Sequence, residues 1–207
     1  MNIAIIGTGN VGGALAYKWA KAGHHIHLGL RSRESFKRKH LLQLSEVQAH
    51  SIKEAVAVSE VVLIATPATT VESVAKGLGD TNGKVLIDAM NIVRGNGPEG
   101  FQNTADALKH YTEGAEVVKC FNTTGFNNML NPLYGDQKLD AFVAGDSQRG
   151  KDLASQLALD AGFAACYDIG GDANFSMMEQ FARFWINLAM VQGHGREIGF
   201  KLLKREE

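Results

Sequence analysis

The fold is decided by the first stretch of the chain, residues 1–13, which reads MNIAIIGTGNVGG. Its apolar residues 2–6 predict a short buried strand of the kind found in parallel sheets. A glycine-rich loop follows directly, and residues 11–22 predict the helix that this loop opens. Strand, loop and helix in this order are the context in which a GxGxxG motif binds a dinucleotide.

The glycines of the loop have distinct physical roles. Gly7 allows the tight turn, Gly9 lets the backbone approach a pyrophosphate, and Gly12 lets the helix pack closely on the strand. The unpaired N–H groups and the positive end of the helix then face the phosphates. We therefore predict that the whole loop binds a dinucleotide: Gly7, Thr8, Gly9, Asn10, Val11 and Gly12. The alternative is a glycine turn that binds no ligand.

Outward from the motif, apolar strand-sized runs alternate with amphipathic stretches, which predicts βαβ repetition and a parallel sheet. Further strands are expected at 25–30, 47–49, 61–65, 84–88, 116–120, 141–144 and 164–169. Helices are expected at 34–42, 52–58, 71–77, 103–110, 148–161 and 173–203, the last broken at Gly193, Gly195 and Gly199. Residues 90–103 and 122–137 are expected to be long loops. We predict an α/β fold, a Rossmann doubly wound, mostly parallel sheet (1–138) with a small C-terminal α/β annex (139–207).

Composition narrows the function classes. The 207 residues carry a formal net charge of −1, with 45% hydrophobic and 21% charged residues. A near-neutral chain argues against general nucleic-acid binding or membrane-surface binding, which need a strong positive field. The apolar runs are too short for a membrane helix, and the first one runs into a glycine loop, unlike a signal peptide. Cys120 and Cys166 form no CxxC pair, which favours a reducing, cytoplasmic setting.

The end of the second predicted strand selects the dinucleotide. Proteins that bind NAD usually carry an acid there to hold the ribose 2′-hydroxyl, whereas this chain reads Leu30-Arg31-Ser32-Arg33. Guanidinium groups pair with a 2′-phosphate in forked geometry. We therefore predict NADP(H) binding at Arg31, Ser32 and Arg33. The neighbouring cations Lys37, Arg38 and Lys39 are interpreted as a solvated helix face.

Several segments together resemble one family. They are Gly7–Gly12, Gly29-Leu30-Arg31-Ser32-Arg33, Thr66-Pro67, Val118-Lys119-Cys120-Phe121-Asn122-Thr123, Val143-Ala144-Gly145-Asp146 and Gly193-His194-Gly195-Arg196-Glu197-Ile198-Gly199-Phe200-Lys201. In this order they resemble the F420-dependent NADP oxidoreductases, a group related to the cytosolic domain of six-transmembrane metalloreductases. The resemblance implies a Rossmann domain, a small C-terminal domain and a cleft between them. NADP(H) would exchange hydride there with a deazaflavin or flavin.

The resemblance also implies residue roles. Thr8, Arg31 and Ser32 would take the 2′-phosphate, while Thr66, Pro67 and the adjoining Ala68 would line the ribose and nicotinamide. Asn122 and Thr123 would face the second ligand. Ala68 stands where F420-using members tend to carry a bulky aromatic residue, and Leu30 where they often have Ser. The acceptor therefore stays open among F420, a flavin and a small carbonyl compound.

Topology adds a prediction of its own. Ligands bind outside the carboxyl ends of strands in open α/β sheets, so Thr66-Pro67, Met90-Asn91 and Asn122-Thr123 should converge at one edge. We expect Met90, Asn91, Asn122, Thr123 and Gly195 to contact the acceptor, with residues 193–199 as the wall. Loop capping is an equal alternative for Asn122 and Thr123.

Hydride transfer between two bound rings needs alignment and a dry cleft more than an acid or base, so no catalytic residue and no metal are predicted. Lys119 is expected to be a sheet-edge or helix-facing lysine, Asp88 a loop cap and Cys120 a packing residue. His25 and His27 are expected to face solvent. Phe181, Phe184, Trp185, Leu188 and Gln192 form a stripe that predicts a homodimer.

Two function hypotheses remain. The first is an NADP-dependent oxidoreductase with a small-molecule electron acceptor, and the second is a non-catalytic NADP(H)-binding or sensor module. Space with polar groups beside the nicotinamide distinguishes them, because only an enzyme needs it. A 3-hydroxyacid or imino-acid reductase shares the Rossmann start but carries a larger helical C-terminal domain.

Overall fold

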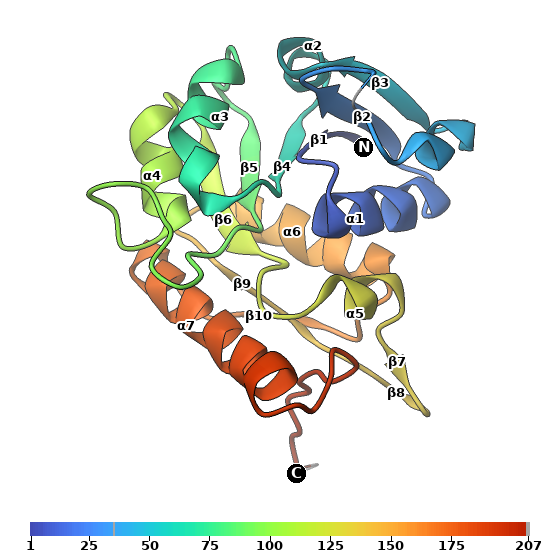
Figure 1. Ribbon diagram of the computed structural model, residues 1–207, viewed down its shortest axis with the longest axis vertical. Helices are drawn as coiled ribbons and strands as arrows, with labels where there is room; N and C mark the ends of the chain where they lie inside the picture. Colours follow the sequence, from blue (N-terminus) through green and yellow to red (C-terminus); the bar gives the residue numbers. More distant parts are fainter. Residues whose placement is uncertain (35, 206–207) are drawn as a thin grey trace.

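One sheet of eight strands runs through the molecule, with helices on both faces (Figure 1). The computed structural model describes residues 1–34 and 36–205. The sheet has the order β10-β9-β6-β5-β4-β1-β2-β3. Its strands are β1 (Asn2–Ile6), β2 (His25–Leu30), β3 (Val47–Ser51), β4 (Val61–Ile64), β5 (Val85–Asp88), β6 (Glu116–Cys120), β9 (Ala141–Ala144) and β10 (Cys166–Asp168).

The six strands from β3 to β6 are all parallel, and the register pairs Ile5 of β1 with Leu63 of β4. The chain then reverses direction. β9 pairs antiparallel with β6, joining Cys120 to Val143, and β10 pairs parallel with β9. The prediction of a mostly parallel, doubly wound α/β sheet is confirmed. The C-terminal strands extend the same sheet, and the division at 138/139 stays a prediction.

Helices cover both faces because the central strands β1, β4 and β5 are apolar and buried on both sides. One face carries α1 (Asn10–Lys21), α5 (Phe126–Leu130) and α6 (Gln148–Ala161). The other carries α2 (Ile52–Ala57), α3 (Val71–Gly77), α4 (Thr104–Tyr111) and α7 (Phe175–Ile186). Trp19 of α1 is fully buried and its indole N–H donates to Leu157 O of α6 at 2.8 Å. That bond fixes two helices of the first layer to each other.

Three predicted segments are wrong in part. Of the expected helix 34–42, the described residues show only a 3-10 turn at Lys39–Gln43, and residue 35 lies outside the described residues. The expected loop 122–137 contains α5 and a hairpin, β7 (Leu133–Tyr134) with β8 (Gln137–Lys138). Helix α7 ends in a π turn at Asn187–Val191. Positive φ at Gly193 and Gly195 stops it there, since left-handed backbone cannot continue a right-handed helix.

A buried ion cluster joins β5, β6 and α7. Lys119 on β6 is fully buried, and its Nζ lies 2.6 Å from Asp88 Oδ2 and 2.9 Å from Glu179 Oε1 of α7. The same ammonium donates to Met90 O and to the Thr104 hydroxyl, both at 2.9 Å. Lys119 is thus helix-facing, as expected, and β6 is not an edge strand.

The carboxylates of this cluster also hold the backbone of the loop after β5. Asp88 Oδ1 accepts from Met90 N at 2.9 Å, which confirms Asp88 as a loop cap. Glu179 Oε2 accepts from Ile92 N at 2.8 Å, and its Oε1 accepts from Thr104 N at 2.9 Å. Complete burial raises the pKa of the Asp88 carboxyl. The Lys119 ammonium and the hydrogen bonds that Asp88 accepts from Thr104 and Met90 N oppose the rise. The loop is therefore anchored where it leaves the sheet.

The buried cluster gives a stability prediction. Lys119→Met should lower the free energy of unfolding by about 3–5 kcal/mol, because it leaves two buried carboxylates without their cation. Urea denaturation followed by circular dichroism measures the effect.

The control is Lys76→Ala, which removes an exposed pair with Glu72 on α3 and should leave the midpoint nearly unchanged. Equal midpoints for Lys119→Met and wild type would show that the cluster does not stabilise the fold.

Candidate functional site

The glycine loop has the geometry that phosphate binding requires. Gly7 has a φ of +98°, and a Cβ there would collide with Ala65 O. A Cβ on Gly12 would collide with Gly7 O, so the first turn of α1 packs directly on the loop. Gly9 has open space around it, and no side chain caps the N-terminus of α1. The N–H groups of that turn therefore fit the phosphates of a dinucleotide.

The segment after β2 carries three arginines, one of which contacts this loop. Arg31 is exposed, and it forms no hydrogen bond or ion pair within residues 1–34 and 36–205. Arg33 is also exposed, and its guanidinium donates to Ala49 O at 2.6 Å. Arg38 donates to Asn10 Oδ1 at 2.6 Å. The interpretation of Arg38 as part of a solvated helix face is therefore wrong, because the chain folds back onto α1 at this point.

The three predicted strand-end segments meet at the carboxyl edge of the sheet. The Thr66 hydroxyl donates to Met90 Sδ at 3.3 Å. Asn91 Nδ2 donates to Asn122 O, and Asn122 Nδ2 donates to Asn91 Oδ1, both at 2.9 Å. Thr123 is buried beside them in the chain. The predicted convergence is confirmed, whereas the binding roles of these residues stay predictions.

The Asn122 amide is held in one orientation. Its Nδ2 donates to Asn91 Oδ1 and to Met178 O of α7 at 3.1 Å, which leaves Oδ1 as the free end. That oxygen is buried and has no hydrogen-bond partner among the residues the structure describes. The preceding Phe121 adopts a φ of +60°, uncommon for a residue with a side chain. Packing of its ring on Trp19, 5.4 Å between centroids, holds this strained turn.

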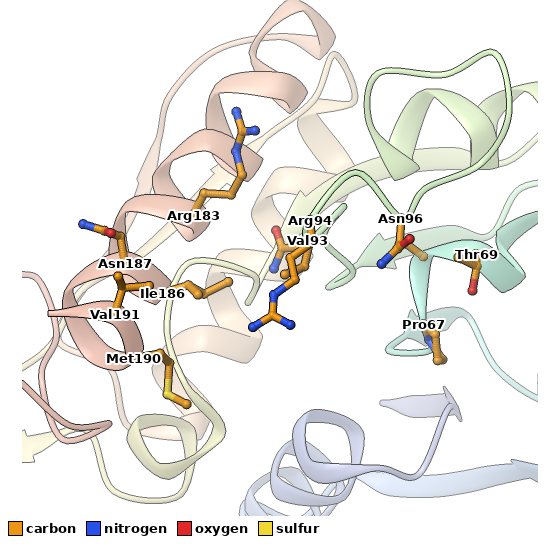
Figure 2. A pocket seen from close by; sticks show the side chains of 12 residues that line it. Pro67, Thr69, Val93, Arg94, Asn96, Arg183, Ile186, Asn187, Met190 and Val191 are labelled. Carbon is orange, nitrogen blue, oxygen red and sulfur yellow. The ribbon is translucent and has the colours of Figure 1, made fainter. Parts of the chain in front are cut away.

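A pocket of about 800 Å³ opens beside these segments (Figure 2). Pro67, Ala68 and Thr69 line one side, and the loop after β5 lines another through Asn91, Val93, Arg94 and Asn96. The third side is the end of α7 with its π turn: Arg183, Ile186, Asn187, Met190 and Val191. Figure 2 shows Arg94 between the α7 side and the Pro67 side. Its φ is +56°, a second left-handed residue at this edge.

Sequence reasoning placed the wall of this pocket incorrectly. Residues 193–199 were expected to form it, but Gly195 is exposed, has open space around it and does not line the pocket. The wall is the end of α7, because the Gly193 and Gly195 turn carries the chain away. Ile198 O instead accepts from Trp185 Nε1 at 2.7 Å and from Asn128 Nδ2 at 2.6 Å. Contact of Gly195 with an acceptor stays a prediction without support from this geometry.

Other residues weighed in the sequence lie away from the pocket. His27 is buried rather than solvent-facing, with its ring nitrogens on His50 at 3.1 Å and Asn2 at 3.0 Å. Burial, with help from His50 and His25, lowers the pKa of His27. Cys120 is buried in the core, and burial raises the pKa of its thiol. Within the described part of the chain, His, Cys, Asp and Glu form no cluster of three that could hold a metal ion.

The sequence could not have indicated Arg94, Arg183 or Glu179. Each lies in a segment with no motif, and only the fold brings them to the strand ends.

The helices formed by the described residues are all too short or too polar to cross a membrane.

Comparison with known proteins finds relatives that are similar in sequence and in fold. The family model for NADP oxidoreductase, coenzyme F420-dependent, matches residues 2–92. An F420-dependent NADP reductase of Methanothermobacter marburgensis is 27% identical over 229 aligned positions, covering all of both chains. A crystal structure of a candidate F420-dependent NADP-reductase from Arthrobacter sp. FB24 covers 99% of this chain and 100% of its own, with 24% identity and a TM-score of 0.84.

A reductive aminase from Aspergillus terreus, solved with NADPH and ethyl-5-oxohexanoate, shares the fold at a TM-score of 0.69 and 19% identity. The alignment covers 93% of this chain but only 63% of the reductive aminase chain. The family match spans the glycine loop and strands β1 to β5, and the relative from Methanothermobacter marburgensis aligns with the whole chain. The chain is therefore similar to the coenzyme F420-dependent NADP oxidoreductases over residues 2–92, and to one F420-dependent NADP reductase over its whole length.

Proposed function

We propose that this protein is an NADP(H)-dependent oxidoreductase that transfers hydride between NADPH and a planar acceptor in the α7 pocket, a deazaflavin, a flavin or another small molecule. One observation carries the proposal. An apolar pocket of about 800 Å³ lies beside Pro67 and Ala68, where the nicotinamide is expected, at the edge that the glycine loop also occupies. Such a pocket is large enough for a second ring system.

In this proposal, different residues bind the two ends of the dinucleotide. The loop from Gly7 to Gly12 and the cations Arg31 and Arg33 bind the phosphate end of the dinucleotide. Thr66 and Pro67 orient the other end, since they follow β4 directly. NADPH supplies the hydride when bound. The protein supplies alignment and exclusion of water, which is the main demand of hydride transfer.

The lining of the pocket favours an acceptor with an apolar body and a polar rim. Ile186, Met190 and Val93 offer apolar surface, while Arg94, Arg183 and Asn91 offer donors. Behind this lining, Asn122 is hydrogen-bonded to Asn91, and its buried Oδ1 would gain a partner if a ligand N–H reached it. A sensor module needs none of this space, so the pocket favours the enzyme.

The decisive experiment is a screen of NADPH oxidation with purified protein against F420, FMN, FAD and quinones. Turnover with one of them identifies the acceptor class. NADPH binding without turnover on any acceptor would favour the sensor alternative.

We further propose a homodimer that uses the outer face of α7. The structure divides the predicted stripe, because Trp185 is buried and the Phe181 ring packs on Phe142 and Phe200 at 5.2 and 4.6 Å. Phe184 remains 53% exposed, although its ring stacks on Phe200. Met177 on the same helix is 55% exposed. A second copy would cover these side chains.

The cations after β2 predict cofactor preference. The protein should bind NADPH more tightly than NADH, and replacing Arg31 and Arg33 together by Ala should cost about 1.5–3 kcal/mol for each charged hydrogen bond lost. NADH affinity should hardly change. Fluorescence titration measures both dissociation constants. Equal affinity of the native protein for the two dinucleotides would contradict the prediction.

The pocket wall predicts a separation of turnover from cofactor binding. Ile186→Trp fills the pocket, so it should lower kcat/KM for the acceptor at least about tenfold while NADPH affinity stays within about twofold. Leu159→Trp adds the same bulk on the exposed surface of α6, away from the pocket and from the α7 face, and is the matched control. Full turnover of the Ile186 variant would place the acceptor elsewhere.

The exposed face of α7 predicts the oligomeric state. Analytical ultracentrifugation should give a dimer of the 22.3-kDa chain. Phe184→Glu should give a monomer, because it places a charge in the buried interface. A monomeric wild type at micromolar concentration would refute the interface.

A further inference from the structure

Arg38 lies across the beginning of α1, in a segment that does not form the helix expected at 34–42. Its Nη2 donates to Asn10 Oδ1 at 2.6 Å. Asn10 is the first residue of α1, so the guanidinium lies beside the turn whose N–H groups no side chain caps. The segment after β2 thus returns to the glycine loop.

A notch in α1 receives the side chain. A Cβ on Gly13 would stand 2.5 Å from Arg38 Cδ and 2.7 Å from its Nε, inside any real contact distance. Gly13 is buried although it lies in the first turns of the helix. The missing side chain at Gly13 leaves the space in which the Arg38 side chain lies on the helix. Glycine is a poor residue inside a helix, so this space comes at a cost in helix stability.

The guanidinium is only partly used by this contact. It carries five N–H donors in a planar fork, and the Asn10 oxygen takes one of them. Arg38 is half-buried, and its partner Asn10 directly follows Gly9, which has open space around it. A planar fork beside uncapped helix N–H groups is suited to phosphate oxygens.

We propose that Arg38 is a binding residue of the dinucleotide site, and that the Gly13 notch positions its guanidinium to bind a phosphate group of the dinucleotide. The inference rests on the proposed function for the identity of the ligand. It adds a residue that the motif does not contain. The phosphate is either the 2′-phosphate or the pyrophosphate, and the two dinucleotides distinguish them.

The test compares dissociation constants for NADPH and NADH in four proteins: wild type, Arg38→Ala, Gly13→Ala and the double variant. Arg38→Ala should weaken NADPH binding about tenfold or more, the effect of one charged hydrogen bond. Gly13→Ala keeps the charge and favours the helix, so it should fold. Its methyl group displaces Arg38, and it should weaken binding by a similar factor.

The double variant separates positioning from direct contact. Gly13→Ala should have no further effect once Arg38 is Ala, because the notch then holds nothing. Lys39→Ala, which removes an exposed cation one residue away, is the matched control and should change neither constant by more than about twofold. A loss confined to NADPH assigns the 2′-phosphate, and equal losses for NADPH and NADH assign the pyrophosphate.

Unchanged affinities in Arg38→Ala would overturn the inference, and so would an undiminished effect of Gly13→Ala in the double variant. A wild-type chain that binds neither dinucleotide would instead refute the proposed function, and this inference with it. The two failures are therefore distinguishable.

Discussion

Lys119 carries its ammonium group to the centre of the molecule, where water cannot reach it, so its partners must come from the chain itself. They come from β5, from the start of α4 and from α7, segments far apart in the sequence. A buried cation of this kind costs free energy unless every partner is in place. The demand fixes α7 against the sheet and the loop after β5 against α7. Both segments line the pocket, so this one cluster sets the positions of two of its walls.

Prediction from sequence works where the signal is local. The first strand, the glycine loop and α1 are contiguous, and apolar runs such as β4 and β5 admit one interpretation in a parallel sheet. The helix expected at 34–42 fails because the Arg38 contact with α1 is a tertiary interaction that no local propensity contains. The end of α7 fails for a similar reason: its glycines indicate a break, but not where the chain goes afterwards.

The candidate site divides in the same way. Its proposed dinucleotide half consists mainly of one contiguous motif, so the roles of Gly7, Gly9 and Gly12 can be predicted from their spacing alone. Its acceptor half is assembled from strand ends and from a helix that arrives last, and Arg94 and Glu179 have no local pattern around them. Two left-handed residues with side chains, Arg94 and Phe121, also lie here. Their strain is held by packing and by the anchored loop, which only the folded chain provides.

The reversal of strand direction at β9 has a consequence for how such a protein can change. Because β9 and β10 run opposite to the other strands, the loops that follow them open at the far edge of the sheet, as the contact of Ser147 with Glu116 at the start of β6 confirms. Those loops are therefore remote from the pocket and can vary in length without altering its lining. After β10 the chain returns to the pocket edge through α7, whose second half lines the pocket together with the loops after β4 and β5. A change of the proposed acceptor would then require substitutions in α7 and these two loops, while the glycine loop stays unchanged.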